Sequence, residues 1–359
     1  MATPAASPQI DESKLNEFMG RAVGDMGAAM HAVLIVLGDK LGLYKAMSDG
    51  APVSPAELAQ RTGTNERSVR EWLNANAASG YVTYDAATAN FHLPPEQALA
   101  LALENSPAFL PGAFQIIASC FHDVDRTEAA FRTGKSVGWH EHHHDLFVGT
   151  ERFFRPGYIA NLLSSWIPAL DGVEAKLNRG GKIADVGCGL GSSTILMASA
   201  FPESEVVGFD YHEGSIELAN AAAKRAGLGD RLRFEVASAA SYPGDHYDFV
   251  TFFDCLHDMG DPVAAAKHVC STMQDDGTWM VVEPFADDAT EKNHNPVGRV
   301  FYSASTLLCV PASLSQEKGM ALGAQAGEKQ IGEVVRAGGF SRFHRAAQTP
   351  FNLVFEARP

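Results

Sequence analysis

The densest group of chemically active side chains is the segment WHEHHHD, Trp139 to Asp145, which holds four histidines and two carboxylates. The chain has 13 histidines in all, so nearly a third of them lie here. Imidazole transfers protons near neutral pH and is a common metal ligand. His140 and His144 have the i, i+4 spacing at which two side chains share one helix face. Three interpretations therefore stay open: a metal site, a proton-transferring segment that covers a pocket, and a solvated surface.

A glycine-rich stretch, IADVGCGLGSS, lies between a run typical of a buried strand and a run typical of a helix. Such glycines let the backbone turn sharply and approach a ligand closely at a helix N-terminus. Their spacing is G-x-G-x-G, whereas the dinucleotide fingerprint requires G-x-G-x-x-G. An acid, Asp185, stands two residues before the first of them. The three glycines are Gly187, Gly189 and Gly191.

Further polar residues follow the next expected strands. Asp210 stands at the end of VVGFD, where an acid of a Rossmann-like sheet binds ribose hydroxyls. The alternative is that Asp210 caps the helix expected over GSIELA. Because parallel strands end at one edge of a sheet, we expect several such residues to converge there: Asp185, Asp210, Ser238 and Asp254.

A histidine and a glutamate stand at the same expected edge. His257, in CLHDMGDP, follows the fourth strand, and its imidazole titrates in the range that suits a general base. The alternative is a histidine that caps the following helix or bonds locally. Glu283 ends the fifth strand, TWMVVEP, where it could orient a base or cap a helix.

The bulk properties exclude several classes of protein. A chain of 359 residues with 46% hydrophobic and 20% charged residues is long enough for two globular domains. A formal net charge of −15 disfavours nucleic acid and anionic membranes as partners. The early apolar run AVLIVL is far too short to span a bilayer. Five cysteines without a C-x-x-C pair indicate reduced thiols, so we expect a cytoplasmic protein.

The N-terminal part predicts a mainly helical winged-helix domain over residues 13–104, after a disordered tail over residues 1–12. MHAVLIVLGDKLGLYKAM is typical of an apolar helix, SPAELAQRTG has a capping-box start, and YVTYDAATANFHL alternates like a hairpin. The expected recognition helix pairs Arg67 and Arg70 with Glu66 and Glu71, so it carries no net charge. DNA binding needs clustered cations, so a packing and dimerisation module is favoured.

The rest of the chain predicts a connector over residues 105–180 and an α/β domain over residues 181–359. Five short apolar runs alternate with helical segments, which is typical of a parallel sheet buried on both faces. A final strand pair, SRFHRA and PFNLVFEAR, follows the last helix. An insertion over about 285–325 mixes apolar residues with Arg299 and Tyr302, as expected of a wall of a small-molecule pocket.

The motifs D-V-G-C-G-L-G, the acid ending strand two, FFDCLHDMGDP and VVEP resemble those of class I S-adenosylmethionine-dependent methyltransferases. The resemblance is strong over about 180–359 and looser over 14–103, where it implies a dimerisation module. It implies a seven-stranded Rossmann-like sheet, a homodimer and S-adenosylmethionine as cofactor. It also implies that the glycines pack against the methionine portion, that Asp210 holds the ribose, and that Ala237 and Ser238 cover the adenine. The full expected cofactor set is Asp185, Gly187, Gly189, Gly191, Asp210, Tyr211, Ala237, Ser238 and Asp254.

The same resemblance implies methyl transfer to a small molecule, with no resident metal. A hydroxyl acceptor needs a base, and LHDxxD is similar to the segment that supplies this histidine in small-molecule O-methyltransferases. Oxygen acceptors are favoured, and sulfur acceptors stay open. The expected catalytic residues are His257, His140, His142 and His144, and the expected acceptor pocket includes Trp139, Glu283, Arg299 and Tyr302. The alternative function is a winged-helix regulator that uses the second domain as a metabolite sensor.

Overall fold

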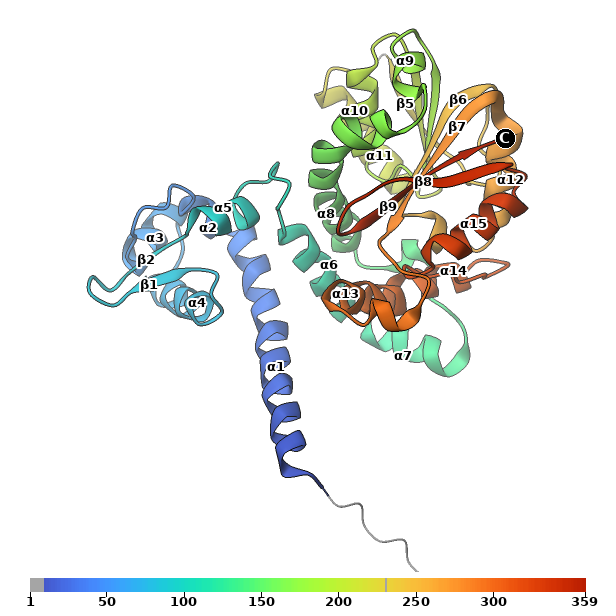
Figure 1. Ribbon diagram of the computed structural model, residues 1–359. Helices are drawn as coiled ribbons and strands as arrows, with labels where there is room; N and C mark the ends of the chain where they lie inside the picture. The colour runs from blue at the N-terminus through green and yellow to red at the C-terminus, as the bar shows by residue number, and fades with distance from the viewer. Residues whose placement is uncertain (1–9, 230) are drawn as a thin grey trace, which may run out of the picture. The chain divides into compact units, whose positions relative to one another are not determined.

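The computed structural model describes residues 10–229 and 231–359, and the chain divides into two compact units after Ala118 (Figure 1). Most of the predicted tail lies outside the described residues. Helix α1 (Glu12–Lys40) already begins at Glu12, where Asp11 accepts hydrogen bonds from backbone N–H groups of the first turn. The single helix expected over MHAVLIVLGDKLGLYKAM is wrong, because Gly42 adopts a left-handed conformation (φ 69°) and ends α1 before α2.

The first unit has the predicted order of helices followed by a hairpin. The capping box at the start of α3 is present: Ser54 and Glu57 bond to each other's backbone N–H. Helices α1 and α4 meet closely, since a Cβ on Gly38 would lie 2.5 Å from the Trp72 ring. The unit's elements after α1 are α2 (Leu43–Ala46), α3 (Pro55–Thr62), α4 (Glu66–Ala78), β1 (Thr83–Asp85), β2 (Asn90–His92) and α5 (Pro95–Leu101).

The second unit contains the predicted seven-stranded sheet, in the order β5-β4-β3-β6-β7-β9-β8. The first five strands are parallel, and β9 runs antiparallel to both of its neighbours. The α/β prediction and the terminal strand pair are therefore confirmed. The strands are β3 (Lys182–Val186), β4 (Glu205–Asp210), β5 (Leu232–Val236), β6 (Tyr247–Phe253), β7 (Met273–Pro284), β8 (Arg342–Gln348) and β9 (Asn352–Arg358).

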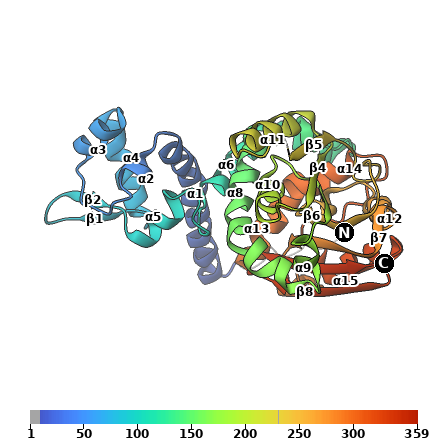
Figure 2. The same ribbon diagram turned by 90° about the horizontal axis from the view of Figure 1, so that it is seen from above.

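Helices cover both faces of this sheet, as the unbroken apolar strands predicted. Successive strand residues alternate between two cores, so Phe249 packs on one face and Val250 on the other. Helices α8, α10 and α11 cover the first face, and α12 and α15 cover the second (Figure 1). Helix α8 packs against α10, as Figure 2 also shows. Their bounds are α8 (Asp145–Asn161), α10 (Ser192–Ala200), α11 (Glu213–Arg225), α12 (Pro262–Thr272) and α15 (Gly327–Ala337).

The connector and the insertion are helical. The connector contains α6 (Pro111–His122), α7 (Val124–Thr133), η1 (Trp139–Glu141), α8, η2 (Leu162–Trp166), η3 (Ile167–Ala169) and α9 (Val173–Leu177). The insertion contains η5 (Thr290–Asn293), α13 (Pro296–Ala304), η6 (Ser305–Cys309) and α14 (Val310–Leu314), and η4 (Leu256–Asp258) follows β6. By length and composition alone, α1 and the helical segment Pro296–Leu314 could span a membrane, a criterion that core helices of soluble proteins also satisfy.

Candidate active site

The glycine loop connects β3 to α10, and all three glycines have positive φ: 75°, 52° and 85° in chain order. A Cβ on Gly187 would lie 2.7 Å from the Sγ of Cys255, and one on Gly191 would lie 2.5 Å from Phe234. A Cβ on Gly189 would meet no atom of the described residues within 4 Å. Two glycines are therefore required by packing, whereas the third leaves open space beside the loop, where a ligand can approach the backbone.

Asp185 lies behind this loop. Its carboxylate is fully buried and accepts hydrogen bonds from the hydroxyls of Ser193 (2.7 Å), Thr194 (2.6 Å) and Thr251 (2.9 Å). Burial raises the pKa of Asp185, and the three hydroxyls partly offset that rise. Asp185 thus ties β3 to α10 and β6, and its effect on a ligand is exerted through the loop that it positions.

Asp210 ends β4 beside the glycine loop. One carboxylate oxygen accepts the backbone N–H of Gly189 at 3.0 Å, and the other accepts that of His212 at 2.9 Å. The N-cap of α11 is His212 rather than Asp210, so the capping alternative for Asp210 is wrong. Burial raises its pKa. Backbone bonds therefore fix this carboxylate next to the open side of Gly189.

The remaining expected adenosine residues surround the end of β4. The backbone N–H of Ala237 donates to the carbonyl of Asp210 at 2.9 Å, and the adjacent Ser238 is exposed. The side chain of Tyr211 is half exposed, and burial, followed by the charge of Asp210, raises its pKa. These residues lie together at one edge of the sheet, as the sequence predicted, and their role as cofactor ligands stays a prediction.

His257 and Glu283 form a buried pair at the same edge. The Nδ1 of His257 lies 2.5 Å from Oε2 of Glu283, whose other oxygen accepts the backbone N–H of Leu256 at 3.0 Å. Both side chains are about 4% exposed. Glu283 therefore orients the imidazole, which was one of its two predicted roles.

The second ring nitrogen of His257 faces another acid. Its Nε2 lies 3.1 Å from Oδ1 of Asp258. Burial alone would lower the pKa of His257, but the carboxylates of Asp258 and Glu283 outweigh it and raise that pKa well above its ordinary value. The two carboxylates therefore favour the protonated form of His257, the imidazolium.

The insertion packs against this loop. Burial, followed by the charge of Asp258, raises the pKa of the Cys309 thiol to about 12, so that thiol stays protonated beside His257. Gln316 accepts the backbone N–H of Gly260 (2.8 Å) and donates to the carbonyl of Asp258 (2.9 Å). Of the two expected wall residues, Tyr302 is half-buried and Arg299 is exposed, so neither is yet assigned a contact with an acceptor.

Asp254, just after β6, combines burial with an unusual backbone. Its φ is 51°, and its Oδ1 accepts a hydrogen bond from Asn352 at 2.9 Å. Its Oδ2 is buried and has no hydrogen-bond partner among the described residues. Burial, followed by the neighbouring Glu283, raises its pKa well above the ordinary value. An unpartnered buried carboxylate oxygen at this edge fits a cationic or hydrogen-donating ligand group.

The segment WHEHHHD lies against the end of β4. The ring of His140 meets Tyr211 edge-on, with 6.2 Å between centroids, and Phe147 stacks on His212 at 4.5 Å. Trp139 in turn packs edge-on against Phe147. These contacts place the segment beside the expected adenosine site, which favours the interpretation that it covers a pocket.

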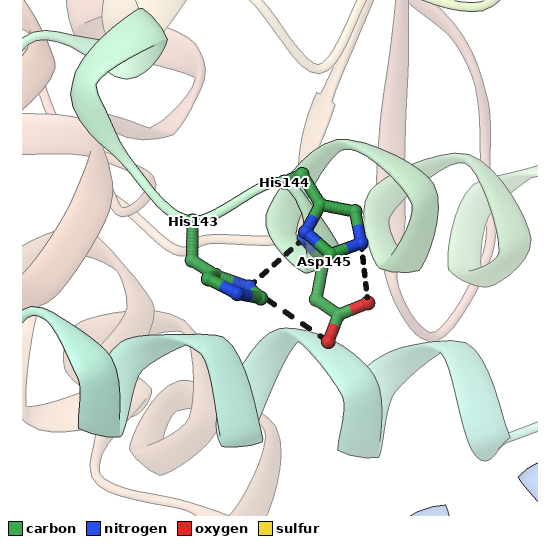
Figure 3. Close-up of side chains that lie close together, drawn as sticks. All are labelled: His143, His144 and Asp145. Atoms are coloured by element: carbon green, nitrogen blue, oxygen red, sulfur yellow. Dashed lines mark hydrogen bonds and ion pairs between the residues drawn. The ribbon is translucent and has the colours of Figure 1, made fainter.

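Three consecutive residues of the segment lie at the N-terminus of helix α8, which begins at Asp145 after the N-cap His144. The ligand atoms of His143, His144 and Asp145 lie within 4.8 Å of one another (Figure 3). However, His143 accepts the backbone N–H of Asp145 at 3.2 Å, and the side chain of His144 is 77% exposed. A carboxylate at a helix N-terminus is also stabilised by the helix dipole. The arrangement is therefore explained by the start of the helix, and His144 fits the solvated-surface interpretation.

His142 differs from its neighbours because its side chain is only 1% exposed. Its Nδ1 lies 2.7 Å from Oδ2 of Asp123, the residue between α6 and α7. The sequence did not single out Asp123, since no motif links it to a histidine 19 positions away. Glu151 was also missed: it accepts a hydrogen bond from Ser192, at the start of α10, at 2.6 Å.

Comparisons with known proteins agree with the two units. Residues 29–103 match the family model of the Rv2258c-like winged HTH domain, and residues 177–334 match that of a methyltransferase domain. Over 87 residues, the chain is 38% identical to the 27-O-demethylrifamycin SV methyltransferase of Amycolatopsis mediterranei. That alignment covers 24% of this chain and 32% of the relative. The curated relatives that it matches are covered over 20% to 42% of their own length.

Solved structures resemble the chain over nearly its whole length. Human N-acetylserotonin methyltransferase, in complex with S-adenosylmethionine, has a TM-score of 0.70 at 14% identity, and 99% of each chain is covered. An O-methyltransferase family protein from Burkholderia thailandensis has a TM-score of 0.67 at 14% identity, and 98% of each chain is covered. At these identities, the likeness establishes the fold.

Proposed function

Because the chain belongs to the class I S-adenosylmethionine-dependent methyltransferases with an N-terminal winged-helix domain, we propose that it methylates an oxygen or sulfur atom of a small molecule. The observation that carries this proposal is the His257–Glu283 pair, with 2.5 Å between Nδ1 and Oε2. It lies at the sheet edge that also holds the glycine loop and Asp210. A methyl donor and a proton acceptor can therefore meet at one place.

The cofactor would be held by the residues at the ends of β3, β4 and β6. Asp210 would bind the ribose hydroxyls, and Tyr211, Ala237 and Ser238 would border the adenine. The open side of Gly189 supports placing the methionine portion against the loop. The unpartnered Oδ2 of Asp254 supports a partner of positive charge. When bound, the cofactor supplies an activated methyl group on a sulfonium.

His257 would accept the proton that the acceptor loses. Glu283 holds Nδ1, so the proton of the acceptor would go to Nε2, and the acceptor would take the place of Asp258 beside that nitrogen. Asp258, 3.1 Å from Nε2, would stabilise the imidazolium that results. The two carboxylates raise the pKa of His257 and so favour the imidazolium. The ring must lose this proton before it can accept one from the acceptor. The activity should therefore increase with pH.

The acceptor class follows from the need for a base. Phenols have a pKa of about 10 and thiols one of about 8.5, so both gain from proton removal near neutral pH. Oxygen is favoured because the O-methyltransferase resemblance covers the segment that bears His257. Transfer of a labelled methyl group to a panel of phenols, thiols and amines tests the proposal. Tight cofactor binding without transfer to any member would contradict it.

The connector would close over the cofactor edge. Its contacts with Tyr211 and His212 support this placement, and exclusion of water favours methyl transfer over side reactions. Single substitutions of His140 and His144, which are both exposed, should change turnover less than substitution of the buried His142.

We further propose a homodimer formed through α1. This helix exposes apolar residues at spacings of three or four, the pattern of a helix that packs on another helix: Leu15, Met19, Val23, Met26, Met30, Val33, Leu37. A charge in the middle of this stripe, Met26→Glu, should convert the dimer to a monomer in light-scattering measurements. A wild-type protein that is monomeric at micromolar concentration would contradict this.

A DNA-binding role is not proposed. On α4, Arg67 pairs with Glu71 and Arg70 pairs with Glu66, so these cations are neutralised within the helix. Phosphate contacts require cations that are available to the backbone of DNA. A cytoplasmic location is proposed on the basis of five cysteines, all of which are free thiols.

A further inference from the structure

The pair formed by His142 and Asp123 has the form of an oriented base. Nδ1 of His142 lies 2.7 Å from Oδ2 of Asp123. The guanidinium of Arg126 lies 3.7 Å from the other oxygen of Asp123 and also donates to the carbonyl of Glu141. A carboxylate can only accept hydrogen bonds, so the neutral imidazole carries its proton on Nδ1. Its Nε2 is then a hydrogen-bond acceptor with a fixed direction.

The second ring nitrogen of His142, Nε2, is also buried. Nε2 of His142 has no hydrogen-bond partner within residues 10–229 and 231–359. Leaving a buried polar atom unsatisfied costs about 1–3 kcal/mol, so the orphaned Nε2 requires an explanation, and a hydrogen-donating group of a ligand supplies one. The carboxylate that orients this ring, that of Asp123, is itself buried.

The position of the pair points to the methyl acceptor. His142 follows η1 directly, and that turn holds His140 against Tyr211. Tyr211 directly follows Asp210, the last residue of β4, so this turn lies beside the cofactor edge. His142 therefore lies in the part of the connector that contacts the end of β4.

We propose that the Asp123–His142 pair binds a second hydrogen-donating group of the methyl acceptor, while His257 serves the reacting atom. This inference rests on the proposed function and narrows its substrate class. The acceptor would carry a second donor besides its reacting group, as in a dihydroxybenzene, an aminophenol or a mercaptophenol. A site built to accept a hydrogen bond discriminates against analogues that lack the donor, because its own polar atom is then left unpaired.

Two nitroaromatic probes test the proposal without turnover. The full-length protein, saturated with S-adenosylhomocysteine, is titrated with 4-nitrocatechol and with 4-nitrophenol, and binding is followed by absorbance. We expect the wild type to bind 4-nitrocatechol about 10- to 100-fold more tightly, the effect of one buried hydrogen bond. Equal affinities for the two probes, or binding of neither, would overturn the proposal.

Two substitutions of one residue separate binding from structure. His142→Asn places an amide where Nδ1 lies, so it retains the bond to Asp123 but removes the acceptor at Nε2. His142→Gln places an amide near Nε2. We expect the asparagine variant to lose the preference for 4-nitrocatechol and the glutamine variant to keep part of it. His246→Asn, at a histidine whose side chain is 71% exposed just before β6, is the matched control and should bind as the wild type does.

The outcomes distinguish this inference from the proposed function. Methyl transfer by a wild type that binds both probes equally would overturn the role of His142 and leave the methyltransferase proposal intact. Probe discrimination that disappears in His142→Asn, without methyl transfer to any acceptor, would support the binding role and contradict the methyltransferase proposal. If His142→Asn still prefers 4-nitrocatechol, other residues cause that preference and the proposed role of His142 is overturned.

Discussion

Replacing Glu283 by glutamine removes one of the two charges that stabilise the His257 imidazolium. The nearest atoms of the pair are 2.5 Å apart, and the centres of the two charges are further apart. Two unit charges about 4 Å apart attract by about 4 kcal/mol at an effective dielectric constant of about 20. One pH unit corresponds to about 1.4 kcal/mol, so Glu283→Gln should lower the pKa of His257 by up to about 3 pH units.

The assay is kcat/KM for methyl transfer as a function of pH. Because His257 must be neutral to accept a proton, and its pKa is raised, the wild-type rate should rise with pH through a value above 6.5. In Glu283→Gln this acidic limb should move to lower pH. The plateau should fall, by about 100-fold, because the amide has one acceptor for both Leu256 N–H and Nδ1–H.

Asp275→Asn is the matched control, since it removes one charge from an exposed position of the same strand, β7. It should leave the acidic limb where it is in the wild type. An acidic limb that stays in place in Glu283→Gln, or that moves to higher pH, would refute the assignment of His257 as the titrating base.

Three further substitutions make separate predictions. His257→Ala should keep cofactor affinity, measured by calorimetry, and lose about 100- to 10,000-fold in kcat; an unchanged kcat would exclude His257 as the base. The raised pKa of Asp254 means that folding is more stable when this group is neutral, and stability is lost as pH rises through that pKa. Asp254→Asn, which tolerates φ 51°, should therefore raise the melting temperature at pH 8 by about 2–4 °C per kcal/mol gained and weaken cofactor binding; a lower melting temperature would contradict this. Gly191→Ala should destabilise the fold more than Gly189→Ala does, because both positions have a positive φ that strains an alanine but only the Cβ at position 191 would also lie 2.5 Å from Phe234. Gly189→Ala should bind the cofactor less tightly, and equal thermal unfolding of the two variants would refute the distinction.

The sheet and its edge could be predicted because they depend on local pattern. Five unbroken apolar runs separated by helical segments specify a parallel sheet, and the polar residues that follow them must share one edge. Asp210 and His257 were placed at that edge in this way, and the structure has them there. The glycine spacing likewise indicated the loop, although only the structure separates the packing role of Gly191 from the open side of Gly189.

The sequence could not decide between the interpretations of the histidine segment, because the burial of each side chain depends on tertiary contacts. His142 and His144 are two residues apart and chemically identical, yet their side chains are 1% and 77% exposed. The two side chains differ in burial because Asp123, which lies between α6 and α7, bonds to His142. The ion pair of His257 with Asp258 was likewise not expected, since adjacency in sequence does not bring two side chains together.

Transfer of a labelled methyl group from S-adenosylmethionine, with wild type and His257→Ala compared side by side, tests the central claim most directly. The account predicts a labelled methoxy or thioether product from a phenol or thiol, and a loss of that product in the variant at unchanged cofactor affinity. A wild type that binds the cofactor tightly but labels no acceptor, or a variant that labels as fast as the wild type, would contradict it.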